Sequence, residues 1–202
     1  MASNRSLTPL SVSVLSLLLE QPMHPYEMLQ TLINRREDLI VKVRTGTLYH
    51  TVDRLAKDGL IEPVGTDRSG NRPERTSYRI TEPGRQLLET EITALLSSTA
   101  NEYPRFPQAI AEAHNLPKDV VIDRLRSRIS DQRTRITLLR DGIRHLGEIN
   151  LPAHLWLDID YLHTIHTAEL DWLVALVERL TTGDIDWDTN HRDGTPRPPE
   201  QD

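Results

Sequence analysis

The 202-residue chain contains no cysteine, and this absence removes several kinds of chemistry at once. Without thiols there is no disulfide scaffold, no cysteine nucleophile and no thiolate-ligated metal. Long hydrophobic runs are also missing, because the apolar stretch Val14 to Leu19 is interrupted by Ser16 and is too short to cross a bilayer. Residues 1–8 carry one arginine and no apolar segment, so we expect no secretion signal, no membrane partner and a cytoplasmic protein.

Sequence motifs of known catalytic chemistry are missing as well. The chain shows no nucleophile elbow, no P-loop and no dinucleotide fingerprint. The neighbouring acids Asp158 and Asp160 read as helix-surface positions rather than as an acid–base pair. We therefore expect no enzyme and no cofactor.

The net charge of −6 argues against a nucleic-acid partner only when it is averaged over the whole chain. Residues 1–80 carry 11 basic and 9 acidic side chains, whereas residues 81–202 carry 13 basic and 21 acidic ones. The segment from Arg35 to Arg79 is the most basic, with ten positive and seven negative side chains. The acidity thus belongs to the second half, and the first half can present a mildly basic face.

Caps, prolines and apolar spacing predict the order helix, helix, helix, hairpin, helix over residues 1–99. Thr8 and Pro9 begin the first helix, Pro25 begins the second, and Thr45 caps a third that stops at Gly59. Two short strands, 60–64 and 75–81, flank a turn rich in glycine, asparagine and proline. Thr81 then caps a fourth helix. This order is typical of a winged helix-turn-helix DNA-binding domain.

Residues 100–182 are predicted to form a helical dimerisation and effector domain. A linker containing Pro104 and Pro107 leads to a short helix ending near Asn115. A long helix then runs from Pro117 to about Gly147, and another from Pro152 to about Leu180. Residues 183–202 are rich in Asp, Pro and Gly with little apolar content, so we expect a disordered tail. The fold class is therefore mainly α with a small β-hairpin wing and a coiled-coil-like helical region.

The long helix carries four heptads, with isoleucine at a and leucine at d, interrupted by one glutamine. The a positions are Ile122, Ile129, Ile136 and Ile143, and the d positions are Leu125, Gln132, Leu139 and Leu146.

Arginines flank this apolar stripe, at e positions 126, 133 and 140 and at g positions 128 and 135. A parallel self-pair would set arginine against arginine, so we expect the helix to pair with the acidic final helix, either within a chain or between two chains. The alternative is an ordinary helical bundle whose charges are solvated. The residues predicted to form the dimer are Ile122, Leu125, Ile129, Ile136, Leu139, Ile143, Leu162 and Leu173.

The third helix and the hairpin turn supply the candidate DNA contacts. In a helix-turn-helix, the start of this helix enters the major groove, and hydroxyls and a phenol suit phosphates and base edges. A wing can place its basic residues along phosphates or in the minor groove. The alternative is an ordinary exposed helix and turn. The predicted DNA contacts are Lys42, Arg44, Thr45, Thr47, Tyr49, His50, Arg54, Arg68, Asn71, Arg72 and Arg75.

Short motifs in the first half resemble those of PadR-like transcriptional regulators. The run Gly46-Thr47-Leu48-Tyr49, followed by Leu55 and Asp58-Gly59-Leu60-Ile61, is similar to the GTLY…L…GLI signature of that family. Met23-His24-Pro25-Tyr26-Glu27 resembles its HGYE segment, and Tyr78-Arg79-Ile80-Thr81-Glu82-Pro83-Gly84 resembles its wing exit. The two long C-terminal helices resemble the larger branch of the family.

The resemblance implies a homodimeric repressor that binds a pseudo-palindromic operator, with Tyr49 at the DNA and the C-terminal helices forming the dimer. Two residues depart from the family pattern: Pro25 stands at a usual glycine, and His50 stands where proline is frequent. Protonation of His50 beside phosphates would tighten binding at lower pH, whereas a merely exposed histidine would not.

Three aromatic side chains and one polar stripe on the last helix are further candidates. Trp156, Tyr161 and Trp172 could line a site for a small aromatic effector of the kind some relatives sense, or could simply pack. His163, His166 and Glu169 lie at metal-ligand spacing, but a polar stripe on a bundle helix is the simpler interpretation, and we assign no metal. The alternative function from another class is a winged-helix adaptor that binds protein instead of an operator.

Overall fold

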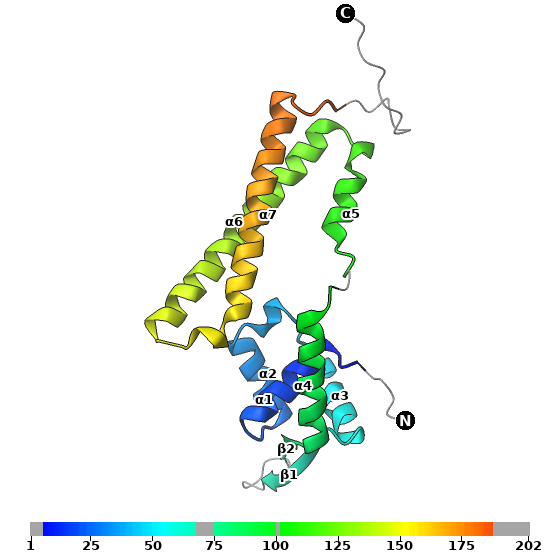
Figure 1. Cartoon of the computed structure of the whole chain (residues 1–202), viewed down its shortest axis with the longest axis vertical. Coiled ribbons are helices and arrows are strands. Elements are labelled where there is room, and N and C mark those ends of the chain that lie inside the picture. The colour runs from blue at the N-terminus through cyan, green and yellow to red at the C-terminus, as the bar shows by residue number, and fades with distance from the viewer. Residues whose placement is uncertain (1–5, 68–74, 100–101, 188–202) are drawn as a thin grey trace, which may run out of the picture. The chain divides into compact units, whose positions relative to one another are not determined.

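The computed structural model describes residues 6–67, 75–99 and 102–187 (Figure 1). The chain divides into two compact units, Met1–Asn101 and Glu102–Asp202. The fold is mostly helical with one antiparallel hairpin, as the sequence predicts.

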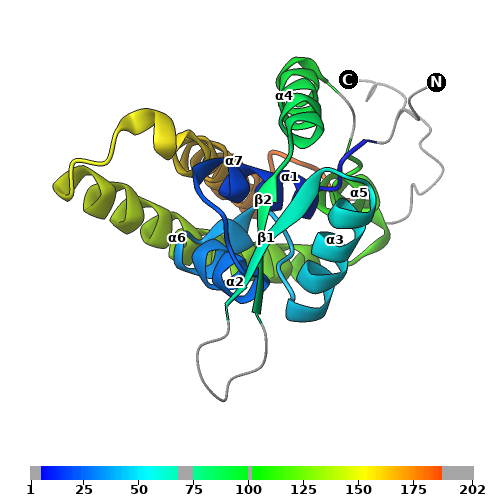
Figure 2. The ribbon, with the colours of Figure 1, turned by 90° about the horizontal axis from the view of Figure 1, so that it is seen from below.

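The first unit has the predicted order of three helices, a hairpin and a helix, with a short 3-10 turn, η1, between the second and third helices. Strands β1 and β2 pair in antiparallel register (Figure 2). The elements are α1 (Pro9–Glu20), α2 (Pro25–Asn34), η1 (Glu37–Leu39), α3 (Thr45–Lys57), β1 (Ile61–Asp67), β2 (Arg75–Ile80) and α4 (Glu82–Ser97).

Side-chain caps fix where three of these helices begin. The Thr8 hydroxyl accepts a hydrogen bond from the Ser11 N–H at the start of α1, with proline at the first helical position. At α2, the His24 ring accepts from the Tyr26 N–H, and Glu27 accepts from the His24 N–H. Thr81 caps α4 through the Gly84 N–H. The predicted starts of α1, α2 and α4 are thereby confirmed.

The core of the first unit lies among α1, α2, α3 and the hairpin. On α3 the buried side chains Leu48, Val52 and Leu55 recur at helical spacing, and this is the predicted inward face. They meet the fully buried Leu15 of α1 and Met28 of α2. Packing of this face against α1 and α2 determines which side of α3 faces away from the core.

Close backbone contacts connect the end of α3, the hairpin and the start of α4. Gly59 takes the left-handed conformation, with φ of 72°, and ends α3. The Thr81 hydroxyl donates to the Gly59 carbonyl, and the Thr81 N–H donates to the Leu60 carbonyl. A Cβ added to Gly84 would collide with that same Leu60 carbonyl oxygen. The Gly59-Leu60-Ile61 and Thr81 to Gly84 motifs therefore belong to one structural joint.

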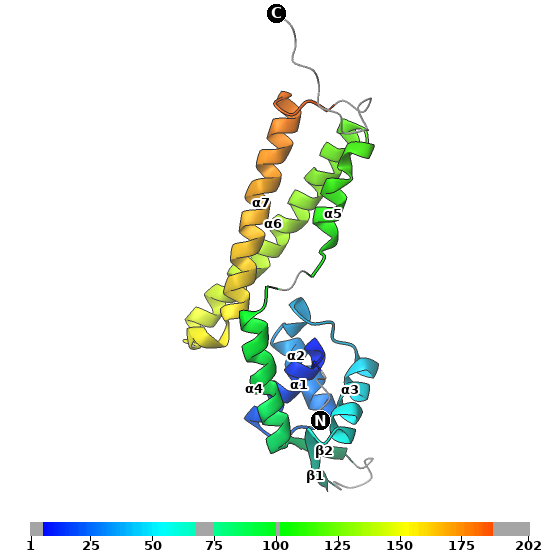
Figure 3. The same cartoon turned by 45° about the vertical axis from the view of Figure 1, so that its right-hand side comes forward.

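The second unit consists of a short helix, two long helices and 3-10 turns. Helices α6 and α7 lie side by side along much of their length (Figure 3). The last helix begins at Leu157 rather than at Pro152, because a 3-10 turn occupies the residues between them. The elements are α5 (Arg105–Ala111), η2 (Ala113–Asn115), α6 (Lys118–Glu148), η3 (Ala153–Leu155) and α7 (Leu157–Thr182).

The heptad stripe of α6 packs against α7 within the same chain. Leu125, Ile129 and Leu139 are buried, as is Leu173 of α7, so these four predicted dimer residues already lie in the core of one chain. Their assignment to a contact between chains stays a prediction. The other four, Ile122, Ile136, Ile143 and Leu162, are half-buried.

An ion pair and a hydrogen bond accompany this packing. The Arg128 guanidinium pairs with Glu169, and the Gln132 amide, which interrupts the apolar heptads, donates to the same carboxylate. The expected pairing of the arginine-flanked helix with the acidic one therefore occurs within the chain.

The packed region extends beyond the end of α7. Ile185 and Trp187 pack against the α6–α7 core, and the Trp187 indole N–H donates to the Leu116 carbonyl at 2.9 Å. Residues 183–187, which the composition assigns to a disordered tail, thus take part in the second unit. The remainder of that tail, 188–202, lies outside the described residues.

Candidate nucleic-acid interface

The start of α3 presents backbone N–H groups that no described side chain caps. Thr45 is the first helical residue rather than the cap, which corrects the prediction, and Arg44 takes the cap position without a side-chain hydrogen bond. The first carbonyl of the ladder is that of Arg44, bonded to the Leu48 N–H at 2.9 Å. A helix start of this kind, with free N–H groups and the positive end of the helix dipole, favours an anion such as a phosphate.

The exposed side chains around this start are those that the sequence assigns to DNA. Thr45, Thr47 and His50 are exposed, and Tyr49 keeps 40% of its surface accessible although it is a large aromatic residue. Thr51 differs from its neighbours because it is buried and its hydroxyl donates to the Thr47 carbonyl at 2.8 Å. The outward surface of the first two turns therefore combines hydroxyls, a phenol and an imidazole.

Two basic residues precede the helix, and a third, Arg54, lies within it. Lys42 and Arg44 are exposed in the extended segment that leads into α3. Arg54, two turns into the helix, donates from Nη2 to the hydroxyls of Thr8 and Ser11 at the start of α1. Arg54 therefore ties α3 to α1, and only its other N–H groups are left for the predicted DNA contact.

The hairpin strands β1 and β2 flank the segment of the sequence that carries most of the predicted wing residues. Pairing runs from Ile61 opposite Ile80 to Asp67 opposite Arg75, with a bulge between Pro63 and Gly65. The ion pair of Arg79 with Glu62 occupies a basic side chain that the sequence analysis does not assign to DNA. Arg68, Asn71 and Arg72, together with the side chain of Arg75, lie outside the described residues.

The three aromatic residues proposed for an effector do not converge within one chain. The Trp156 indole N–H donates to the Leu151 carbonyl, Tyr161 is exposed, and Trp172 packs edge-to-face on Phe106 with ring centroids 6.2 Å apart. Trp156 and Trp172 are sixteen positions apart, about 24 Å along a helix axis. One small ligand within a single chain could not contact all three.

Polar residues form a cluster between α6 and α7. The ring of His166 lies 3.4 Å from the Arg135 guanidinium and 3.9 Å from a Glu169 oxygen, while Arg128 lies over the Phe106 ring at 3.7 Å. Burial, and then the charge of Arg135, lowers the pKa of His166, so the ring is neutral at pH 7.

This polar cluster shows how the candidate metal ligands are used. Glu169 is already bound to Arg128 and Gln132, in agreement with the simpler interpretation of a polar stripe on a bundle helix. Among the described residues, no group of three or more histidine, aspartate or glutamate side chains could hold a metal ion. No helix in the described part of the chain is long and apolar enough to cross a membrane.

A pocket lies on the opposite side of α6, lined by Arg126 and Arg133, and the sequence alone does not predict it. The heptad positions of the two arginines were visible in the sequence. Two of their apolar neighbours, Val174 and Val177, however, come from α7, more than forty positions further along the chain.

Comparison with known proteins connects this geometry to a family. Residues 14–90 match the model of the transcriptional regulator PadR-like family, which confirms the resemblance seen in the short motifs. That family is one of transcriptional regulators rather than of enzymes. No curated protein matches the chain.

Solved structures match over nearly the whole chain, at low sequence identity. Bacillus subtilis PadR in complex with operator DNA superimposes with a TM-score of 0.73 at 15% identity, covering 86% of this chain and 99% of that one. The same protein in complex with p-coumaric acid gives 0.69 at 13%, covering 89% and 99%. The PadR-like regulator BC1756 from Bacillus cereus gives 0.60 at 17%, also covering 89% and 99%. At these identities the likeness shows that the fold is shared.

Proposed function

We propose that this chain, whose residues 14–90 match the PadR-like transcriptional regulators, is a cytoplasmic repressor that binds operator DNA as a homodimer. In this proposal α3 enters the major groove by its first turn, and the wing follows the phosphates beside it. A pseudo-palindromic operator then matches the twofold symmetry of the dimer.

The observation that carries the proposal is the uncapped start of α3. Its free N–H groups, preceded by Lys42 and Arg44, suit a phosphate, and Thr45, Thr47, Tyr49 and His50 surround them. The solved structure of B. subtilis PadR with operator DNA supports this use of the fold. Arg54 contributes through the N–H groups it does not give to α1, and the wing contributes through Arg68, Asn71, Arg72 and Arg75.

The proposed dimer uses the face of α7 that α6 leaves uncovered. Four large apolar side chains, Leu157, Tyr161, Ile165 and Trp172, are exposed there at helical spacing, and they form what we call the α7 stripe. Isolated exposed apolar residues are ordinary, but a continuous stripe of them is typical of a protein contact. A second copy that covers the stripe would bury it without disturbing Leu125, Ile129, Leu139 and Leu173 in the core.

We also propose that a small effector, an aromatic one where the site lies between two chains, releases the repressor from DNA. The complex of B. subtilis PadR with p-coumaric acid supports the binding of a small aromatic acid by this fold. The proposal does not rely on one pocket formed by Trp156, Tyr161 and Trp172 within a chain, because these side chains are too far apart.

Titration of a DNA fragment from the protein's own promoter region tests the DNA-binding proposal. Binding should weaken steeply as salt rises, because each neutralised phosphate releases counterions. Tyr49→Ala should weaken binding about tenfold, the equivalent of a lost base or phosphate contact of roughly 1–2 kcal/mol. Tyr103→Ala, which removes an exposed tyrosine between α4 and α5, is the matched control and should bind like the wild type.

Two outcomes would contradict the DNA-binding proposal. Absence of salt-dependent binding to the promoter fragment would argue against a regulator. If, in addition, the wild-type chain captured a protein partner and Tyr49→Ala abolished this capture, α3 would contact protein rather than DNA.

A further inference from the structure

The arginines of α6 are used differently on its two sides. On the side that faces α5, Arg128 pairs with Glu169 and Arg135 approaches His166. On the other side, neither Arg126 nor Arg133 makes a hydrogen bond or an ion pair with any described residue. Two cationic side chains on one face therefore have no neutralising group in the described part of the chain.

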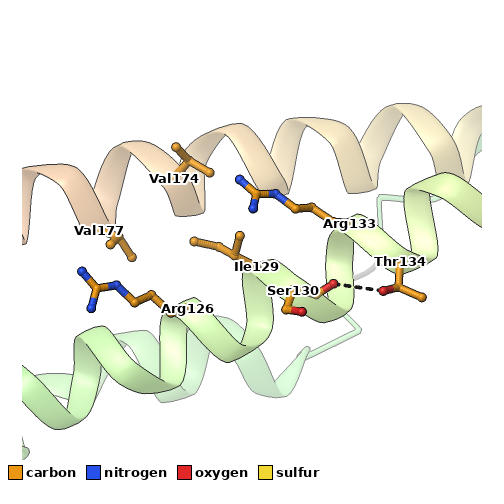
Figure 4. Close-up of a pocket in the computed structure, with 7 residues that line it drawn as sticks. All are labelled: Arg126, Ile129, Ser130, Arg133, Thr134, Val174 and Val177. Atoms are coloured by element: carbon orange, nitrogen blue, oxygen red, sulfur yellow. Dashed lines mark hydrogen bonds between the residues drawn. The ribbon is translucent and has the colours of Figure 1, made fainter.

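These two arginines stand at the ends of a pocket between α6 and α7 (Figure 4). Its volume is about 430 Å³, within the range of sites for small ligands. Ile129 lies between the arginines on α6, and Val174 and Val177 face it from α7. Val174 remains 40% exposed, so the apolar floor is accessible to a ligand.

Two hydroxyls complete the lining. The Thr134 hydroxyl donates to the Ser130 carbonyl at 3.2 Å, which leaves its oxygen able to accept. The Ser130 hydroxyl lies on the same helix turn. The lining therefore consists of cations at both ends, an apolar middle and a polar edge.

The spacing of the arginines sets the length of a matching ligand. Arg126 and Arg133 are one heptad apart, so their Cα atoms are separated by about 10.5 Å along the axis of α6. Each guanidinium can bind a carboxylate by donating two parallel hydrogen bonds. An apolar body of roughly that length, carrying an acid group at each end, would satisfy both arginines and cover the valines at the same time.

We propose that this pocket binds a small amphipathic dianion, an α,ω-dicarboxylate whose apolar chain lies on Ile129, Val174 and Val177. Its two carboxylates pair with Arg126 and Arg133. The binding claim stands apart from the proposed DNA-binding function, and only its use as a regulatory signal rests on that function.

The pocket remains open if the dimer forms through the α7 stripe. Trp172 of the stripe and Val174 of the pocket are two residues apart, and so point about 200° apart around the helix. A second copy covering the stripe would therefore leave the arginine-lined side accessible.

Calorimetry and thermal melting of the purified full-length chain test the proposal, with sebacate as the probe. Sebacate should bind saturably and raise the melting temperature, whereas decanoate, with the same chain length and one acid group, should bind at least tenfold more weakly. Arg126→Gln and Arg133→Gln should each weaken sebacate at least tenfold. Arg140→Gln is the matched control, because Arg140 occupies the next e position and does not line the pocket.

A second type of variant keeps the test decisive if an arginine variant is poorly folded. Val174→Trp fills the apolar floor while retaining both charges, and it should abolish sebacate binding with the helical circular dichroism unchanged. Equal affinity for sebacate and decanoate, or wild-type affinity in both arginine variants, would overturn the proposal.

The other occupant of such a pocket is a second copy of the chain, whose α7 carries Asp171 and Glu178 one heptad apart. Failure of sebacate to bind, combined with dissociation of the dimer in Arg126→Gln and Arg133→Gln, would overturn the ligand proposal in favour of that contact. Promoter binding without ligand is measured separately, so failure of the DNA-binding function is not confused with failure of this site.

Discussion

Gly84 illustrates how a single residue holds the first unit together. Its backbone passes so close to the Leu60 carbonyl that a side chain has no room, and its N–H bonds to the Thr81 hydroxyl. Since Thr81 also bonds to Gly59 and Leu60, the hairpin and α4 are fixed to the end of α3 at this point. The joint positions the wing beside the helix that we assign to DNA.

Replacing this glycine should therefore destabilise the fold. We expect Gly84→Ala to lower the free energy of unfolding by about 1–3 kcal/mol, because the added methyl must displace backbone rather than a flexible side chain. Thermal or urea unfolding followed by circular dichroism measures the change. Gly142→Ala is the control, since that helical glycine has open space around it. This variant should unfold with an unchanged or slightly higher free energy. Equal stability of the two variants would contradict the role of the close approach.

Residue-scale predictions succeeded where spacing alone decides the outcome. The inward face of α3 and the caps of α1 and α4 follow from helical periodicity and from which side chains accept N–H bonds. The partners of Arg54 could not be predicted in this way, because Thr8 and Ser11 are more than forty positions away. Thr45 was misplaced by one residue, since threonine suits both the cap and the first turn.

At the scale of elements, the heptads of α6 predicted an apolar stripe with arginine flanks, but not where its partner helix comes from. Both a neighbouring helix of the same chain and a helix of a second copy satisfy the pattern, because charge and spacing are identical in the two cases. The connection after Glu148 decides between them by returning the chain so that Glu169 reaches Arg128. Gln132, which interrupts the apolar heptads, donates a hydrogen bond to that carboxylate.

This helix pair should also respond to pH through His166. Burial and the nearby Arg135 lower the pKa of His166, while Glu169 opposes the shift. Because Arg135 can only donate, Nε2 of the neutral ring accepts and the proton resides on Nδ1. The unfolded chain then binds more protons than the folded one below the ordinary histidine pKa of about 6.5, so stability falls as the pH is lowered through that region.

Urea unfolding at pH 7.5 and pH 5.5 measures this dependence. The wild type should lose stability between the two values, and His166→Gln should lose less, because its side chain does not titrate. His163→Gln, one turn earlier on α7, serves as the control and should keep the wild-type difference. A His166→Gln variant with an undiminished pH dependence would show that other groups are responsible.

For the whole molecule, the division of charge into two halves was visible in the sequence, whereas the surfaces of the second half were not. Along α7, residues that face α6, the stripe and the arginine-lined pocket alternate within a few positions, as Trp172, Leu173 and Val174 do. Composition does not separate these faces, since all three carry apolar side chains. Only the packing of α6 against α7 shows which of them is buried and which are exposed.

The α7 stripe therefore provides the test at this scale. Ile165→Asp should raise the dissociation constant of the dimer at least tenfold, because an unpaired carboxylate would be buried in an apolar contact. Thr181→Asp places the same charge at an exposed position about 160° around α7 from Ile165 and should leave the dimer intact. Sedimentation velocity over a range of protein concentrations measures both. Since two half-sites must be bound together for tight binding to a palindrome, Ile165→Asp should also weaken operator binding while leaving Tyr49 and the start of α3 unchanged. A dimer that tolerates Ile165→Asp as well as Thr181→Asp would place the contact between copies elsewhere on the second unit.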